Sequence, residues 1–399
     1  MEPRAATRRR TTATGRRWLG VGHRRGDGAR RAAAGAVGDA LAGDDAQLLV
    51  VFCSDAYDLD DLLAGAADAA PGVALIGCST AGEISGTGPG DAGVVVMALG
   101  GPGFGVATAA ARADGGRLRQ ASAAVARCVE EVADRPHRVL LLLTDGLAGD
   151  QQEVVRGAYR TVGAEVPLVG GCAGDGLRMT RTFQLHGTRV LGGSVVGAAI
   201  GSDAPIGIGV RHGWRRVGEA MVVTASAGNR VLRIDDAPAL DVYLDRLGAP
   251  AEARTEPAAF TRFAITHPLG LSRRSGEEVR FVAGADFADR SLVCIAQVPQ
   301  GGQAWIMEGD DESVLAATDQ ACGEAVGALG GRRPLGLLAF DCIARRGVLG
   351  DAGIAREISR ISDFAGGAPV AGFYTYGEIA RTTGISGFHN QTLVVLALA

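Results

Sequence analysis

Residues 47–85 read "QLLVVFCSDAYDLDDLLAGAADAAPGVALIGCSTAGEIS", which is an apolar run, an alanine- and leucine-rich segment and a second apolar run. Both apolar runs have the length of a strand and lack polar alternation, which is typical of strands covered on both faces. The segment between them is long enough for a helix, so the order predicts a crossover connection. This stretch therefore predicts an α/β fold.

The same order of segments occurs three times along the chain, as expected of a repeated supersecondary unit. The first copy runs from "RRWLGVG" to "GVVVMALG", the second from "FGVATAAARA" to "SVVGAAIG", and the third from "GQAWIME" to "TLVVLALA". In each copy the middle strand ends in an acid, which is Asp55, Asp145 or Asp341. A glycine-containing turn ending in Glu83, Asp175 or Glu378 follows later in each copy. The segment from about 205 to 300 departs from the order and is expected to join the two halves.

These patterns predict repeated β-α-β-α-β-β units that form mixed, largely parallel sheets covered by helices. The length of 399 residues agrees with two packed domains. We expect a disordered arginine-rich tail over residues 1–17, a first domain over 18–235, and a second domain over 236–399.

The composition excludes several classes of function. The sequence contains no lysine, so Schiff-base chemistry and a P-loop are excluded. A net charge of −4 argues against nucleic-acid binding. Seven cysteines without a C-x-x-C pair predict reduced thiols in the cytoplasm, with no metal and no cofactor. Because no apolar run approaches the ~20 residues of a membrane helix, membrane insertion is not expected.

Several motifs in a fixed order resemble the FIST family of bacterial signal-transduction proteins. They are "GCSTAGEIS" at 77–85, "HGWRRVGE" at 212–219, "IDDAPALDVYLDRLG" at 234–248, "HPLGL" at 267–271, "FDCIARR" at 340–346 and "GFYTYGEIA" with "GFHNQTLVVLAL" at 372–398. The resemblance implies an amino-terminal and a carboxy-terminal FIST domain. It also implies a sensory protein, not an enzyme, that binds a small polar ligand such as an amino acid. No output module is recognised, so a separate partner is expected, such as a histidine kinase, a cyclase or a chemoreceptor.

The glycine-rich turns are the first part of the predicted ligand site, because turns of this kind expose backbone N–H groups that can hold a carboxylate or a phosphate. If the strand ends converge, the turns bring together Cys78, Ser79, Thr80, Cys172 and Asp175. They can equally be plain tight turns between buried strands.

Charged residues near these turns could recognise an amino acid. Glu83 and Glu378 each stand six residues after a glycine in an apolar strand and could bind an ammonium group. Arg211, Arg215 or Arg345 could bind a carboxylate in bidentate fashion. Surface pairing of these residues is the alternative.

The stretch "GFYTYGEIARTTGISGFHNQ" at 372–391 supplies the third copy's share of the predicted site. Tyr374 and Tyr376 lie two residues apart, so they share one face of an extended strand and could wall a pocket. His389 and Asn390 follow a glycine and precede an apolar strand, where sites are often assembled. All four can instead be structural residues of the core.

Two alternatives to a ligand sensor remain open from the sequence. Cys342 follows a strand and precedes two arginines, which could lower its pKa and make it a nucleophile or a redox sensor. Cys78 carries the same ambiguity. The second alternative is an interaction module without a ligand, in which side chains fill the glycine-acid turns.

Overall fold

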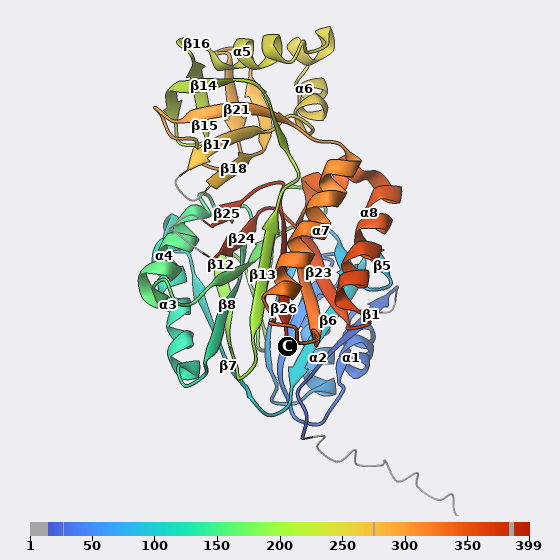
Figure 1. Cartoon of the computed structure of the whole chain (residues 1–399). Coiled ribbons are helices and arrows are strands. Elements are labelled where there is room, and N and C mark those ends of the chain that lie inside the picture. The colour runs from blue at the N-terminus through green and yellow to red at the C-terminus, as the bar shows by residue number, and fades with distance from the viewer. Residues whose placement is uncertain (1–14, 27, 274–275, 383–386) are drawn as a thin grey trace, which may run out of the picture.

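The computed structural model describes residues 15–26, 28–273, 276–382 and 387–399. It confirms the α/β fold: three mixed six-stranded sheets with outer helices form a core, and a smaller β-rich domain lies at one end of it (Figure 1). Residues 1–14 of the predicted tail lie outside the described residues.

Three repeats build the core. The first consists of β1 (Trp18–Arg25), α1 (Ala29–Ala40), β2 (Ala46–Cys53), α2 (Leu59–Ala69), β3 (Ala74–Ser79), β4 (Glu83–Ser85), β5 (Gly88–Gly90) and β6 (Gly93–Gly100). The second consists of β7 (Phe104–Arg112), α3 (Leu118–Ala126), β8 (His137–Asp145), α4 (Gln152–Val162), β9 (Leu168–Ala173), β10 (Gln184–His186), β11 (Arg189–Leu191) and β12 (Ser194–Ser202), with short 3₁₀ turns on either side of α3. The third consists of β13 (Ile206–Arg211), α7 (Asp311–Gly327), β22 (Gly336–Cys342), α8 (Ile343–Ala365), β23 (Val370–Thr375), β24 (Glu378–Arg381), β25 (Phe388–His389) and β26 (Leu393–Leu398).

Each repeat places its strands in the same order. The last strand lies between the first and the middle strand and is antiparallel to both, as in β1-β6-β2-β3. In the described residues, each of the three core sheets has one parallel pair, which is β2 with β3, β8 with β9, or β22 with β23. The sheets are therefore mixed as predicted, but antiparallel pairs are more numerous than expected.

The repeats exchange hairpins in a closed cycle. The hairpin β4–β5 of the first repeat extends the sheet of the third repeat through β23. The hairpin β10–β11 of the second repeat extends the first sheet through β3, and β24–β25 of the third repeat extends the second sheet through β9. Each sheet is completed by a neighbour, so the core has an approximate threefold arrangement.

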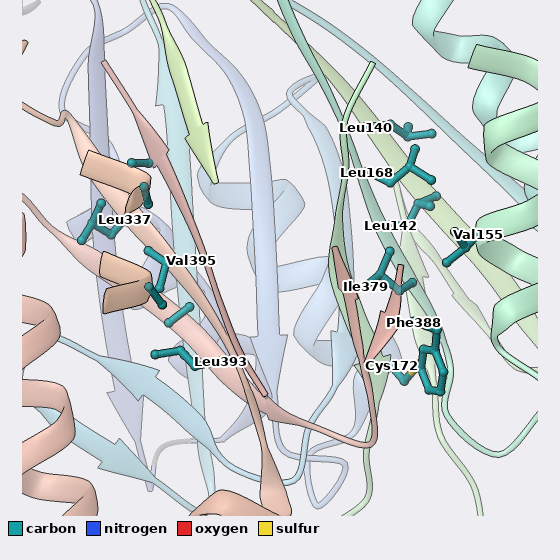
Figure 2. Packing of buried hydrophobic residues seen from close by; sticks show 14 of the residues in the cluster. Leu140, Leu142, Val155, Leu168, Cys172, Leu337, Ile379, Phe388, Leu393 and Val395 are labelled. Atoms are coloured by element: carbon teal, nitrogen blue, oxygen red, sulfur yellow. The ribbon is translucent and has the colours of Figure 1, made fainter. Parts of the chain in front are cut away.

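Apolar side chains from all three sheets fill the centre of the core. Phe52 of the first sheet packs on Phe340 and Phe373 of the third, with ring centroids 6.2 and 4.8 Å apart. The outer faces are covered by helices. Figure 2 shows Ile379 of β24 beside Leu142 of β8 and facing Val155 of α4, so the exchanged hairpin also contributes to this outer layer.

The small domain is an insertion in the third repeat. It consists of β14 (Arg215–Ala227), β15 (Arg230–Ile234), β16 (Ala237–Pro238), α5 (Ala239–Arg246), a 3₁₀ turn (Ala251–Arg254), α6 (Pro257–Ala264), β17 (Leu269–Arg273), β18 (Gly276–Arg280), β19 (Val282–Asp286), β20 (Ser291–Cys294) and β21 (Gln303–Glu308). These strands form a separate sheet with its own apolar core.

Two details of the predicted repeat are wrong. "GQAWIME" is β21 of the inserted domain, while the first strand of the third repeat is β13, which pairs with β26. The acids of the middle strands are not equivalent either, because Asp145 pairs with Ala173, whereas Asp341 pairs with Tyr374 one residue earlier in its ladder. Sequence order hid the first, since the insertion separates β13 from α7. It hid the second because the register of a strand pair is not visible along the chain. The boundary predicted at 235/236 remains a prediction, and it falls in the turn between β15 and β16.

Candidate functional site

Three buried polar side chains occupy equivalent places at the start of the exchanged hairpins. Glu83 pairs with Phe373, Glu378 with Gly171, and Gln184 with Cys78, at matching positions of the three ladders. The carboxyl or amide oxygen accepts a backbone N–H from Gly93, Thr392 or Ser194, at 3.0, 3.2 and 3.1 Å respectively. The equivalent of the two acids in the second repeat is therefore Gln184, not Asp175 as the sequence suggested.

The two acids are held inside the fold. Thr80 donates its hydroxyl to Glu83 at 2.6 Å, and Thr375 donates its hydroxyl to Glu378. The exposed fractions of the two residues are 1% and 0%. Burial raises the pKa of Glu83 to about 7 and that of Glu378 to about 8, against the lowering effect of the threonine hydroxyls. Near neutral pH both groups titrate between a carboxylic acid and a carboxylate.

A pocket of about 540 Å³ lies between the core and the inserted domain. It is at the carboxyl ends of the parallel strands β2, β3 and β22, where ligand sites of α/β proteins are usual. All three repeats and the inserted domain contribute to its lining: Ser54, Asp55, Thr80, Ala81, Gly82, Asp91, Gly176, Leu177, Arg178, Ile265, Phe281, Ile343, Ala344, Arg346, Gly347 and Asp351.

Two ion pairs join the first repeat to the others across this pocket. Arg178 of the second repeat pairs with Asp55, and Arg346 of α8 pairs with Asp91. The Arg346 guanidinium lies over the ring of Tyr374, with its carbon 5.0 Å from the ring centroid. The hydrogen bond from Arg346 lowers the pKa of Asp91, so this pair is fully ionised at neutral pH.

The turn residue at the pocket has a much smaller side chain than its equivalent at the junction of the second and third repeats. Ala81, Gly174 and Tyr376 are equivalent, because their N–H groups donate to the carbonyls of Tyr374, Ser79 and Cys172, at 3.0, 3.1 and 3.1 Å. These bonds form a ring around the threefold axis. At the junction of the second and third repeats the Tyr376 side chain packs on Gly146, where an added Cβ would lie 2.9 Å from that of Tyr376. At the pocket the equivalent side chain is only the methyl group of Ala81.

The loop from 176 to 181 contributes Gly176, Leu177 and Arg178 to the pocket lining, and hydrogen bonds to Asp175 hold the loop in place. Asp175 accepts N–H groups of Met179, Thr180 and Arg181 at 2.7–3.1 Å and the hydroxyl of Tyr376 at 2.5 Å. Burial by itself raises the pKa of Asp175, but these hydrogen bonds together place it well below its usual range. Asp175 therefore anchors the loop as a carboxylate.

Tyr374 and Arg345 belong to a buried polar cluster under α8. Arg345 is fully buried and donates to Asp341 at 2.7 Å and to Glu357. The Tyr374 ring lies in the outer core layer, and its hydroxyl makes no hydrogen bond with the described residues. Arg345 therefore stabilises the fold from within and does not line the pocket, while its neighbour Arg346 does.

His389 and Asn390, two further predicted site residues, lie at β25, which contacts β18 of the inserted domain. His389 is partly buried and donates through Nε2 to the Ala380 carbonyl at 2.9 Å, and burial lowers its pKa. Asn390 is buried, and its Oδ1 has no partner among the described residues. Arg211 lies elsewhere, on the outer surface of β13, where it pairs with Glu324.

All seven cysteines are buried free thiols. Burial raises the pKa of Cys342 and of Cys78 well above the ordinary value, and it raises that of Cys172 to about 12. A nucleophilic or redox-sensing cysteine needs a lowered pKa and access to solvent, so these shifts oppose the cysteine alternative. The charge of the nearby Glu378 carboxylate raises the pKa of the Cys342 thiol further.

Of the fourteen residues predicted to bind a ligand, Thr80 lines this pocket directly. Three others contact residues that line it. Tyr374 packs under Arg346, while Tyr376 and Asp175 hydrogen-bond to the loop that carries Leu177. The sequence reasoning missed Arg346, Arg178 and the two residues of the inserted domain. Adjacent helical residues point about 100° apart, so the sequence indicates that Arg345 and Arg346 face different ways, but it does not indicate which of them faces the pocket.

The described residues contain neither a cluster suited to a metal ion nor a helix suited to span a membrane. No group of three histidine, cysteine or acidic side chains converges as around a metal ion. No helix in this part of the chain has the length and apolar character needed to cross a membrane.

The chain belongs to the FIST family. The FIST N domain matches residues 47–237 and the FIST C domain matches residues 239–381, in agreement with the resemblance found in the motifs. FIST domains are associated with sensing in signal transduction.

Individual relatives carry no further functional information. The chain is similar to an uncharacterised protein of Mycobacterium tuberculosis, Rv0628c, at 26% identity over 235 residues, and to an uncharacterised protein of Mycobacterium bovis, Mb0898c, at 26% over 236 residues. The alignments cover 56% of this chain and 59% and 58% of the relatives. The chain thus spans less than two thirds of the length of the curated relatives that it matches.

Proposed function

We propose that this protein is a sensory module that binds a small polar molecule, such as an amino acid, between the core and the inserted domain. The observation that carries the proposal is the pocket of about 540 Å³, whose volume is in the range of metabolite sites. An interaction module whose turns are filled with side chains would have no such space.

The composition of the lining suggests how binding becomes a signal. Thr80 and Arg346 belong to the core, whereas Ile265 and Phe281 belong to the inserted domain. A ligand that contacts both sides favours one arrangement of the inserted domain over others, and a separate signalling protein could read that arrangement. A cytoplasmic location is part of the proposal and is supported by the seven free thiols.

A thermal-shift panel of amino acids, organic acids and nucleotides tests the proposal. Binding stabilises the folded state by ~2.7 kcal/mol when the free ligand is at a hundredfold excess over Kd, so a true ligand raises Tm measurably. Ala81→Tyr copies the natural Tyr376 and is expected to fill the pocket and abolish the rise. Ala288→Tyr adds the same side chain at an exposed turn of the inserted domain and serves as the matched control.

The expected result is a compound that raises Tm of the parent and of Ala288→Tyr but not of Ala81→Tyr. If no compound raises Tm at millimolar concentration, or if every hit stabilises Ala81→Tyr as strongly as the parent, this pocket is not the site of a sensor.

A further inference from the structure

Arg346 is the more buried of the two arginines that line the pocket. Only 18% of its side chain is exposed, while its partner Asp91 is 71% exposed and lies on the solvent side. Among the described residues, Nη1 of Arg346 donates a hydrogen bond to Asp91, which leaves Nε and Nη2 of Arg346 as donors for a ligand. Because the guanidinium is planar and lies over the Tyr374 ring, these two donors form a fixed fork that fits an oxyanion.

The acidic groups of the pocket are less suited to bind a cation. Asp55 is paired with Arg178, and Asp91 is paired with Arg346. Asp351 is exposed at the start of the second part of α8. A charge is recognised more strongly where water is excluded, which favours the mostly buried guanidinium of Arg346 over the exposed carboxylates of Asp91 and Asp351. The side chain of Asp55 is only 9% exposed, but its charge is already balanced by Arg178.

The pocket lining also has an apolar part. It consists of Leu177, Ile265, Phe281 and Ile343, from the second repeat, the inserted domain and α8. Leu177 is 62% exposed and has a φ of 67°, a backbone conformation that is rare for leucine. Tyr376 accepts the N–H of Leu177 at 2.7 Å, so the loop holds this exposed apolar side chain over the pocket at a cost in backbone strain.

We infer that the pocket takes an amphiphilic anion, in which a carboxylate or sulfonate binds Arg346 and an aliphatic or aromatic body packs on Leu177, Ile265, Phe281 and Ile343. The inference rests on the proposed function and narrows it, because it requires an apolar body and gives no role to an ammonium group. Leu177 is then the residue that selects for the body of the ligand, and Arg346 the residue that selects for its charge.

Two fluorescent naphthalene probes test the inference on the full chain. Anilinonaphthalene sulfonate has an anionic group and an aromatic body, whereas phenylnaphthylamine has the same body without the charge. Octanoate, octylamine and octanol then compete with the bound probe. We expect the sulfonate to bind and octanoate to displace it more effectively than the amine or the alcohol.

Matched variants assign the binding to the pocket. Arg346→Gln is expected to raise Kd of the sulfonate about tenfold or more, because a charge-assisted hydrogen bond is lost, with little effect on the neutral probe. Arg356→Gln, which removes an exposed arginine further along α8, is the control.

Leu177→Asn is expected to weaken the binding of both probes. Met179→Asn changes another exposed residue of the loop with positive φ and is expected to leave the binding of both probes unchanged. Asparagine tolerates this backbone conformation, so both loop variants should fold.

The outcomes separate this inference from the proposed function. Binding of the neutral probe or of octylamine that Ala81→Tyr abolishes, with no effect of Arg346→Gln, would overturn the ligand class and leave the pocket as a binding site. If neither probe binds, or if binding is unchanged in Ala81→Tyr, the inference fails, while the thermal-shift panel still decides the proposed function. Selective loss of the sulfonate in Arg346→Gln and of both probes in Leu177→Asn supports the inference.

Discussion

At the scale of the residue, one buried position holds a glutamate in two of the repeats and a glutamine in the other. Glu83, Glu378 and Gln184 make the same backbone contact at the same place in their repeats. A neutral amide satisfies the position in the second repeat, so a negative charge is not required there for folding. The two glutamates therefore fit as protonated acids, and they give the fold a dependence on pH that glutamine does not.

Glu378→Gln should make stability less dependent on pH. The pKa of Glu378 is raised to about 8 in the folded state from an ordinary value of 4.5, so between these values the folded chain holds a proton that the unfolded chain has released. Stability from this group is fully present below pH 4.5 and is lost as pH rises to about 8. Since one pKa unit corresponds to about 1.4 kcal/mol, the loss is on the order of several kcal/mol in the parent.

Urea unfolding at pH 5, 6, 7 and 8 measures this effect in the parent, in Glu378→Gln and in the converse variant Gln184→Glu. The first variant should lose less stability between pH 5 and pH 8 than the parent, and the converse variant should lose more. Parallel curves for the parent and Glu378→Gln would contradict the assignment of Glu378 as a buried, protonated acid.

At the scale of the element, α8 is two helices joined at a break. Gly350 has φ 60° and ψ −177°, a conformation that is essentially confined to glycine. The part before the break carries Ala344, Arg346 and Gly347 into the pocket, and the part after it covers the third sheet. The break thus allows one segment to serve both the site and the core.

Gly350→Ala is expected to destabilise the protein by about 1–3 kcal/mol, because alanine is strained in this conformation. Gly323→Ala in α7 is the matched control. Gly323 lies inside a regular helix, and an added Cβ would meet nothing closer than a Phe364 ring carbon at 3.6 Å. The control should be neutral or stabilising by up to ~1 kcal/mol. Equal urea midpoints for Gly350→Ala and the parent would show that the break is not required.

At the scale of the whole molecule, the hairpin exchange makes the three repeats one unit of folding. The strand β4 needs β23 as its neighbour, β9 needs β24, and β13 needs β26. The inserted domain, by contrast, leaves and rejoins the core at neighbouring points, since Arg215 is paired with Glu308. The molecule is therefore divisible at the insertion but not at the limit between the two family domains.

Residues 15–237 alone should not unfold cooperatively, because the second sheet would lose β24 and β25 and the third sheet would lose β22, β23 and β26. A chain in which a short glycine-serine linker replaces residues 216–307 should keep a cooperative transition, measured by circular dichroism in urea, while losing the pocket wall formed by Ile265 and Phe281. A stable, cooperative 15–237 fragment, or an unfolded linker variant, would refute this division of the molecule.

The sequence by itself determined the kind of elements, their threefold recurrence and the family, because uninterrupted apolar runs, helix-length segments and glycine turns are local signals. It also placed Thr80 at a strand end that lines the pocket. Tertiary structure alone decided that β13 rather than β21 begins the third repeat, that Gln184 is the equivalent of Glu378, and that Arg346 rather than Arg345 faces the pocket. The first two depend on pairing between strands that are distant in the sequence, and the third depends on which face of α8 is covered. The spacing of residues along the chain encodes neither.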